Sequence, residues 1–279
     1  MKTAIIDVGG GMRGIYATGV LDCCLDEHVH FDLGIGISAG SANISSFFAG
    51  QRGRNKQYYM EYSFRKEYMS VHNFITRKSF LDLNYIYGTL SNSDGEYPLD
   101  YQAIISNPAE FYVLACNALT GETKRFSKQD ISQDHYDIFK ASCAIPFVCQ
   151  PYAIDGIPYY DGALGDTIPL DMAMNYDKIV LILTKPRHVF RTSGKDSFFA
   201  KMIEKQYPIA AERLRTRAGR YNAGVAKAIE LEKIEKVLIV APEDTEGVDT
   251  LTRDKKAFLR LYTRGYMDGH KIAKFIANQ

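Results

Sequence analysis

Short apolar runs alternate with segments of helical periodicity along the first part of the chain. The run from Thr3 to Val8 predicts a buried strand, and the three glycines after it predict a turn. Apolar residues recur at helical spacing from Gly14 to Glu27, and a second apolar run covers Phe31 to Ile37. A segment of small residues then opens another predicted helix. This order of elements is typical of an α/β fold with a parallel sheet.

The later apolar runs add strands to the same predicted sheet. A strand is expected from Phe111 to Ala118, and Asp155-Gly156 between two short apolar arms is a strong hairpin signal. Further expected elements are a helix at His135–Cys143, buried strands at Lys178–Thr184 and Lys236–Val240, and a C-terminal helix at about Lys255–Ala277. Because the run at 236–240 would complete the sheet, we expect residues 1–279 to form a single domain.

Aromatic side chains are concentrated between Gln57 and Tyr87. They alternate with polar residues, and helices packed on the sheet are the simplest explanation. An acyl-chain pocket or a lid is the alternative, and the two explanations are compatible with each other.

The composition is that of an ordinary globular protein. Of its 279 residues 46% are hydrophobic, which suits a substantial core, and the formal net charge of +1 calls for neither nucleic acid nor an acidic partner. Five cysteines without a CxxC motif favour reduced thiols and a reducing compartment. The N-terminal apolar stretch is too short for a signal peptide, and no run approaches the roughly 18 apolar residues of a membrane span. We therefore expect a cytoplasmic protein that meets any lipid substrate at the bilayer surface.

The sequence Gly36-Ile37-Ser38-Ala39-Gly40 lies where a predicted strand turns into a predicted helix. A serine at such a turn presents its hydroxyl above the sheet, and small neighbours, here Gly36 and Gly40, let the strained backbone pack closely. The N-terminus of the following helix favours developing negative charge. The pattern predicts that Ser38 is a nucleophile, although a GxSxG motif by itself also fits a plain tight turn.

A glycine-rich segment, Gly9-Gly10-Gly11-Met12-Arg13-Gly14, follows the first predicted strand. Its GxGxxG spacing is that of a dinucleotide-binding turn, for which Asp32 would be the acidic ribose ligand. Asp32, however, would open the second strand rather than end it. A cluster of free glycine amides also suits an oxyanion hole, and Arg13 could fix the loop or add positive charge.

Two later motifs come from the region around the predicted hairpin. Asp161-Gly162-Ala163 places a carboxylate beside small residues at the end of the second hairpin arm, where it can approach a partner closely. A simple turn aspartate is the alternative. The block ASCAIP, from Ala141 to Pro146, ends a helix on small residues and a proline, and we expect its role to be structural.

Together and in this order, the four motifs resemble those of the patatin family of phospholipases and lipid acyl hydrolases. The resemblance covers about the first 185 residues and looks closest to the small bacterial patatin-like proteins. It implies a three-layer α/β/α sandwich with a mostly parallel central sheet, a Ser38–Asp161 catalytic dyad and an acyl-enzyme intermediate. It also implies an oxyanion hole built by residues 9–14, with no cofactor and no metal. One departure is Asp7-Val8-Gly9, which separates the acid from the glycines where family members often have DGGG.

Three other functions stay open on the residues alone. A Ser-His-Asp esterase would need a histidine after Asp161, and His188 and His270 meet that order, although neither lies in a turn-like motif. A nucleotide-binding oxidoreductase would use the glycines but would leave Ser38 and Asp161 unexplained. A non-catalytic lipid-binding protein of the same fold would keep the motifs without the reaction.

The chain becomes basic and helix-rich from about residue 186. Between Lys185 and Lys227 there are eleven Lys and Arg residues against three acids, and they include Arg213, Arg215 and Arg217. A solvated helical face is the simple explanation. The alternative is a peripheral contact with an anionic membrane surface, to which each nearby charge contributes about 1 kcal/mol.

Overall fold

An eight-stranded mixed sheet forms the centre of the protein. The computed structural model describes residues 1–277, and the strand order of its sheet is β5-β6-β3-β2-β1-β7-β8, with β4 paired to β3. The strands are β1 (Thr3–Asp7), β2 (Leu33–Ile37), β3 (Glu110–Asn117), β4 (Thr123–Ser127), β5 (Tyr152–Ile154), β6 (Ile157–Asp161), β7 (Lys178–Ile182) and β8 (Val237–Val240). Strands β3, β2, β1, β7 and β8 run parallel, whereas β4, β5 and β6 are antiparallel to their neighbours. The expected parallel sheet is therefore confirmed at the centre, and an antiparallel side is added to it at β3.

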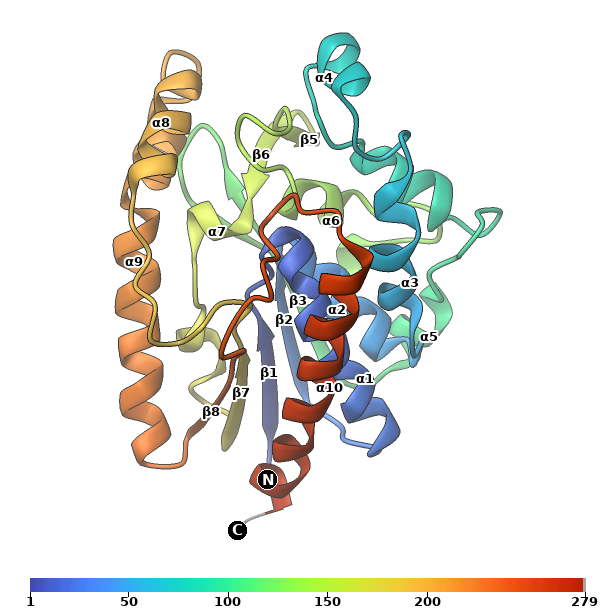
Figure 1. Ribbon diagram of the computed structural model, residues 1–279, viewed down its shortest axis with the longest axis vertical. Coiled ribbons are helices and arrows are strands. Elements are labelled where there is room, and N and C mark those ends of the chain that lie inside the picture. Colours follow the sequence, from blue (N-terminus) through green and yellow to red (C-terminus); the bar gives the residue numbers. More distant parts are fainter. Residues whose placement is uncertain (278–279) are drawn as a thin grey trace.

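Helices cover both faces of this sheet, so the expected three-layer α/β/α arrangement is confirmed (Figure 1). They are α1 (Ile15–Asp26), α2 (Ala39–Phe48), α3 (Arg54–Met60), α4 (Val71–Arg77), α5 (Tyr101–Ser106), α6 (Asp137–Ser142), α7 (Gly162–Gly165), α8 (Gly194–Ile203), α9 (Pro208–Lys233) and α10 (Lys255–Ala277). Short 3-10 turns occur at Gly11–Gly14, Tyr62–Phe64, Lys128–Asp130 and Leu170–Ala173, and a π-helix occurs at Tyr85–Leu90.

Alternating side chains of the central strands supply two separate cores. Ile5 and Val180 belong to the larger core, which also contains the buried residues of α1, α2 and α10. Ala4 and Ile6 point to the other face and pack in a smaller core with Val225 of α9. Because both faces are buried, β1 is apolar almost throughout rather than alternately polar, as is usual for parallel strands.

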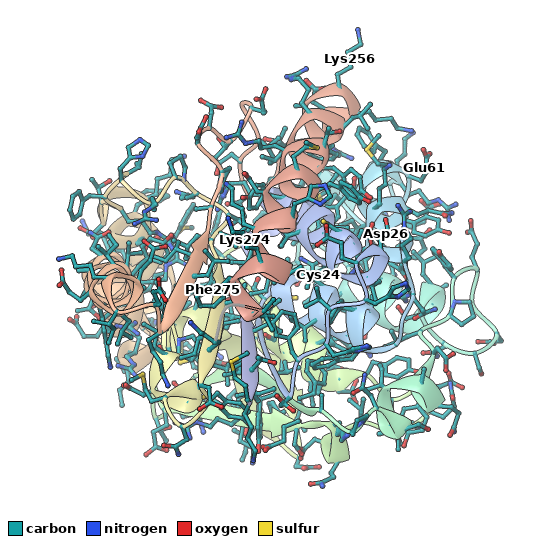
Figure 2. The ribbon with its side chains drawn as sticks, turned by 90° about the horizontal axis from the view of Figure 1, so that it is seen from below. Cys24, Asp26, Glu61, Lys256, Lys274 and Phe275 are labelled. Carbon is teal, nitrogen blue, oxygen red and sulfur yellow. The ribbon has the colours of Figure 1, made fainter. Side chains whose placement is uncertain are left out.

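The C-terminal helix α10 packs so closely against α1 that the backbones of the two helices are in contact. A Cβ atom added to Gly265 would lie 2.0 Å from the carbonyl oxygen of Tyr16, and one added to Gly19 would lie 2.1 Å from that of Tyr262. The Tyr16 hydroxyl also donates to Asp268 at 2.9 Å. Figure 2, which views the molecule from below, shows α10 lying along α1. These glycines therefore join the end of the chain closely to its first helix.

The structure confirms the predicted hairpin and the predicted C-terminal helix, and it shows the backbone of the aromatic segment. The Asp155-Gly156 hairpin is present, with φ values of 50° and 76° that suit a type I′ turn. The C-terminal helix has the expected bounds. Between Gln57 and Tyr87 the aromatic segment forms only short helices separated by irregular chain, and several of its side chains line a cavity.

The structure shows the state of the cysteines and the character of the helices. All five cysteines are free and buried. Among residues 1–277, no helix combines the length and the apolar character needed to cross a bilayer.

Candidate active site

Ser38 occupies a strained turn between β2 and α2. Its φ of 54° and ψ of −131° are unusual for a residue with a side chain. Close packing explains the glycines on either side. A Cβ added to Gly36 would lie 2.4 Å from the Cα of Ser41, and a Cβ added to Gly40 would lie 2.3 Å from the carbonyl oxygen of Asp7. The turn therefore holds Ser38 at the carboxyl end of the parallel strands, where α/β folds place their sites.

The ASCAIP block supports this turn from behind. The backbone N–H of Ser38 donates to Ser142 Oγ at 2.9 Å, and the Ser142 hydroxyl donates in turn to the carbonyl oxygen of Leu114 at 2.6 Å. Ser142 lies at the end of α6 and is fully buried. The block thus has a structural contact with the turn, in line with the role that its sequence predicts.

Asp161 ends β6 beside the Ser38 turn. Its backbone N–H donates to Ala144, and its carboxylate accepts the N–H of Ala163 at 2.9 Å. Burial raises the pKa of the Asp161 carboxyl, while the Ser38 side chain, the Ala163 amide and the charge of Arg217 oppose this effect. Because Ser38 and Asp161 also line the same cavity, the structure brings the two predicted site residues together.

The glycine-rich segment is anchored at both of its ends. The N–H of Gly9 donates to Asp7 Oδ1 at 2.8 Å, and the carbonyl oxygen of Gly9 accepts from the Thr184 hydroxyl. The N–H of Met12 donates to the carbonyl oxygen of Thr250 at 3.1 Å. The amides of Gly9 and Met12 are therefore occupied, so they do not belong to the set of free oxyanion donors that the sequence predicts.

Two amides in the middle of the segment have no such partner. Within residues 1–277, the N–H groups of Gly10 and Gly11 meet no hydrogen-bond acceptor, and both residues line the cavity that contains Ser38. Their φ values of 136° and 61° require glycine or strain. Gly14 has a different role, because a Cβ there would lie 2.3 Å from the Tyr59 hydroxyl oxygen.

Asp7 lies beneath the glycines and is fully buried. Besides the Gly9 amide, it accepts a hydrogen bond from Asn43 Nδ2 at 2.9 Å, and Asn43 also donates to the carbonyl oxygen of Gly14. Burial raises the pKa of Asp7 to about 6, although both hydrogen bonds oppose the shift. Asp7 and Asn43 thus fix the glycine-rich segment, and the extra residue at Val8 does not remove this support.

The C-terminal part of the chain reaches the same segment. Arg13 pairs with Asp249 and donates to Thr250 Oγ1 at 3.2 Å. An added Cβ at Gly11 would lie 2.5 Å from the carbonyl oxygen of Thr250. No motif around Asp249 and Thr250 signals this contact in the sequence, because it depends on residues more than 230 positions apart.

Two cavities meet at Ser38. The smaller one, about 70 Å³, is mainly apolar and is lined by residues of the aromatic segment, which include Tyr59, Tyr68, Leu81, Ile86 and Tyr87. The larger one, about 1030 Å³, contains both Ser38 and Asp161 and opens between the glycine-rich segment and α8. A ligand at Ser38 can thus meet an apolar cavity on one side and a more polar one on the other.

The histidines of the alternative triad lie elsewhere. Neither cavity that Ser38 lines contains a histidine among the described residues. His270 of α10 contacts Glu27 and Cys23, and these three form the one group in residues 1–277 whose ligand atoms are close enough for a metal. The hydrogen bond between His270 and Glu27 accounts for their proximity. The structure therefore does not bring His188 or His270 into either cavity at Ser38.

The dinucleotide alternative fails for a similar reason. Asp32 accepts the backbone N–H of Thr3 at 2.7 Å, where β1 begins. This is the opposite end of the strand from Gly9 to Gly11. Asp32 is therefore not available to a ribose bound at the glycines.

Comparison with known proteins identifies the family. The sequence profile of the patatin-like phospholipases matches residues 8–174, which is more than half of the chain and includes all four motifs. The chain belongs to the patatin-like phospholipase family. A second profile, that of a domain of unknown function (DUF6363), matches residues 207–278.

Two relatives of this patatin-like protein extend the comparison. The chain is 29% identical over 198 residues to the uncharacterized protein YjjU of Escherichia coli (strain K12), an alignment that covers 68% of this chain and 54% of YjjU. It thus spans about half the length of that relative. The crystal structure of VipD from Legionella pneumophila superposes with a TM-score of 0.52 at 14% identity, over 98% of this chain and 67% of VipD, which is a similarity of fold.

The patatin-like site has a basic entrance. The larger cavity is lined by five cations and three carboxylates: Arg13, Lys185, Arg191, Lys195, Arg217, Asp161, Asp196 and Asp249. Arg217 pairs with Asp196, whereas neither Lys185 nor Arg191 forms an ion pair with a carboxylate of residues 1–277. Burial and neighbouring arginines lower the pKa of Lys185 to about 8, and that of Arg191 to about 10. Such crowded, partly desolvated cations favour an anionic ligand.

The arginines of α9 do not form the free basic face that the sequence suggests. Arg213 donates to the carbonyl oxygens of Gly121 and Gly165, and Arg215 pairs with Glu204 and Glu212. These contacts, like the Arg217–Asp196 pair described above, bind the helix to the rest of the protein. The guanidinium groups of Arg213, Arg215 and Arg217 are thus engaged by carbonyl or carboxylate oxygens and are not free cations.

Proposed function

We propose that this patatin-like protein is a lipid acyl hydrolase that cleaves fatty-acyl esters through Ser38 and Asp161. Family membership supports lipid hydrolysis in general. The finer assignment rests on one observation: Ser38, held in a strained turn, lines the same cavity as a buried carboxylate whose pKa is raised by desolvation. A serine hydroxyl needs an adjacent base to become a nucleophile, and a raised pKa makes Asp161 a better base.

The reaction then has two steps. Ser38 Oγ attacks the ester carbon while Asp161 takes the hydroxyl proton, and the oxyanion that forms accepts the free N–H groups of Gly10 and Gly11. The alcohol leaves with the proton from Asp161 and an acyl-Ser38 ester remains. Water attacks this ester, again with Asp161 as base, and the fatty acid and the Ser38 hydroxyl are released. Nothing in this sequence of steps requires a cofactor or a metal.

Covalent labelling tests the nucleophile directly. A fluorophosphonate probe forms a phosphonyl ester with an activated serine and releases fluoride, so we expect one adduct on the peptide that contains Ser38. Fragment spectra would separate Ser38 from Ser41 and Ser45, and the Ser38→Ala variant should not be labelled. Labelling at another serine, or equal labelling of wild type and variant, would refute the assignment.

We further infer that the substrate carries an anionic group, such as the phosphate of a phospholipid, next to the ester. The support is the pair of cations without carboxylate partners, Lys185 and Arg191, at the wall of the Ser38 cavity. Arg191 stacks over the Tyr221 ring at 5.0 Å, which orients its guanidinium.

We also propose that residues 1–279 act as one domain, because β8 pairs with β7 and the carbonyl oxygen of Thr250 accepts the Met12 amide.

Replacing Arg191 by glutamine is expected to lower kcat/KM for a phospholipid about ten- to a hundred-fold, the usual value of a charged hydrogen bond. The loss for an uncharged nitrophenyl ester should be much smaller, because no phosphate is bound. Hydrolysis rates on both substrates measure the ratio. Arg187→Gln is the matched control, since Arg187 lies in the same loop but pairs with Glu232 outside the cavity. Equal losses on both substrates would count against the anion site.

A further inference from the structure

Two short helices expose an unusual amount of apolar surface. On α4, Val71 is 66%, Phe74 40% and Ile75 74% exposed. On α8, Phe198 is 62% and Met202 52% exposed. Large side chains scattered singly on a surface need no explanation, but five concentrated on two short helices do.

An aromatic bridge makes the two helices into one face. The Phe147 ring lies between Phe74 of α4, at a centroid distance of 5.9 Å, and Phe199 of α8, at 5.0 Å. Phe199 also contacts Phe198 at 5.6 Å. Figure 1 shows α4 and α8 projecting at the same end of the molecule, on either side of the loop next to β5 and β6. We call the surface formed by Val71, Phe74, Ile75, Phe147, Phe198 and Met202 the α4–α8 face.

The α4–α8 face adjoins the Ser38 cavity at α8 and at the Phe147 loop. Phe198 and Phe199 line that cavity together with Pro146 and Val148, which flank Phe147 in the chain. The backbone of Phe147 has a φ of 70°, a strained value for a bulky residue, so packing holds this ring between the helices. A partner bound to the face therefore lies next to the cavity that contains Ser38.

The charges around the face are mostly positive. Arg77, the last residue of α4, pairs with Asp82, whereas Lys78 after it forms no ion pair with a carboxylate of residues 1–277. Three exposed lysines lie on or just after α8: Lys201, Lys205 and Lys195, whose Nζ is 3.8 Å from an Asp249 carboxylate oxygen. The acids of the same segment are already paired, Asp196 with Arg217 and Glu204 with Arg215. An apolar surface edged by cations complements the headgroups and acyl chains of an anionic bilayer.

We propose that the α4–α8 face is an interfacial binding surface that docks on an anionic lipid bilayer. Only the role that we give to docking rests on the proposed function: a docked protein would let a lipid ester pass from the bilayer into the Ser38 cavity without crossing water. Val71, Ile75 and Met202 enter the acyl-chain region, and the lysines stay at the headgroups. This assigns the membrane contact to α4 and α8, not to the arginines of α9.

Vesicle co-sedimentation of the full chain tests the docking surface. The parent is Ser38→Ala, so that vesicles are not consumed, and the variant adds Val71→Ser, Ile75→Ser and Met202→Ser. The control instead adds Ile234→Ser, Leu259→Ser and Met267→Ser, which are 71%, 48% and 59% exposed but lie on α10 or after α9. We expect the parent and the control to bind vesicles of phosphatidylcholine with phosphatidylglycerol, and the face variant to bind at least about tenfold less.

Several outcomes would overturn the proposal. They are a parent that does not bind these vesicles, a control that loses as much binding as the face variant, and binding that is as strong to phosphatidylcholine alone. Light scattering provides the last arm: a dimer of the parent that dissociates in the face variant would mean that a second copy covers the face. Circular dichroism of each variant shows whether it is folded.

The same substitutions with Ser38 restored separate docking from catalysis. The face variant should hydrolyse a soluble short-chain ester like wild type, because none of the three side chains lines a cavity at Ser38. Its rate on vesicle substrate should fall with its binding. If wild type hydrolyses no ester but binding still depends on the α4–α8 face, the docking surface stands and the proposed reaction is wrong.

Discussion

Replacing Asp161 by asparagine is expected to lower kcat for ester hydrolysis by about 10³–10⁴-fold while the protein stays folded. Asparagine keeps the shape and the oxygen that accepts the Ala163 amide, but it cannot take the proton of Ser38. Ser38→Ala should reduce the rate to a similar background, since it removes the attacking atom. Steady-state rates on nitrophenyl esters of graded chain length measure both variants.

Asp166→Asn is the matched control for this experiment. Asp166 is likewise a carboxylate whose pKa is raised by burial, and it also accepts a nearby backbone amide, that of Ile168. It lines neither cavity at Ser38, so the variant should be close to wild type. An active Asp161→Asn enzyme, or a loss as large in Asp166→Asn, would exclude Asp161 as the base.

The pH dependence follows from the burial of Asp161. A base acts only when it is deprotonated, and burial raises the pKa of Asp161 above the ordinary value of 3.8. kcat/KM should therefore decrease as the pH falls through an apparent pKa above 3.8, and should be restored when the pH is raised again. A profile that stays flat down to pH 3.8 would contradict a desolvated base.

Gly10→Ala is expected to lower kcat by about 10²–10³-fold, the usual value of an oxyanion donor, with a smaller change in KM. An added Cβ would lie 2.3 Å from Thr184 Oγ1, and the φ of 136° disfavours any side chain, so the segment must shift and move its free amides. Steady-state kinetics on a soluble ester separate the two constants.

Gly156→Ala provides the control for backbone strain. Gly156 also has a positive φ, 76°, but it lies at the tip of the β5–β6 hairpin with no atom within 4 Å of an added Cβ. The variant should keep its kcat even if its stability falls. If Gly10→Ala retains full kcat, the amides of Gly10 and Gly11 are not the oxyanion donors.

Much of the fold follows from patterns that are local in the sequence. Continuous apolar runs mark β1, β2 and β7 because strands buried on both faces exclude polar side chains. The Asp155-Gly156 pair specifies its hairpin because a type I′ turn needs two residues with positive φ. The antiparallel direction of β4 and β5 does not follow from the sequence, since strand direction depends on pairing and not on periodicity.

The candidate site divides in the same way. Ser38 and the glycines are recognisable because a strained turn and a close backbone approach restrict which residues fit there. Which amides remain free could not be predicted, because Asp7 and Thr250 occupy those of Gly9 and Met12 only in the folded chain. The sequence shows that residues 57–87 are rich in aromatic side chains but not how these side chains are arranged. In the structure several of them line the small cavity at Ser38.

By itself the sequence determined the α/β class, the turn that carries Ser38 and the hairpin that ends at Asp161, since these depend on neighbouring residues. Only the tertiary structure decided that Asp249 pairs with Arg13, that Arg217 pairs with Asp196, and that Phe147 joins α4 to α8. Each of these contacts links segments that are far apart along the chain. Their partners are selected by packing and by the need of buried charges for counter-charges, which no local pattern encodes.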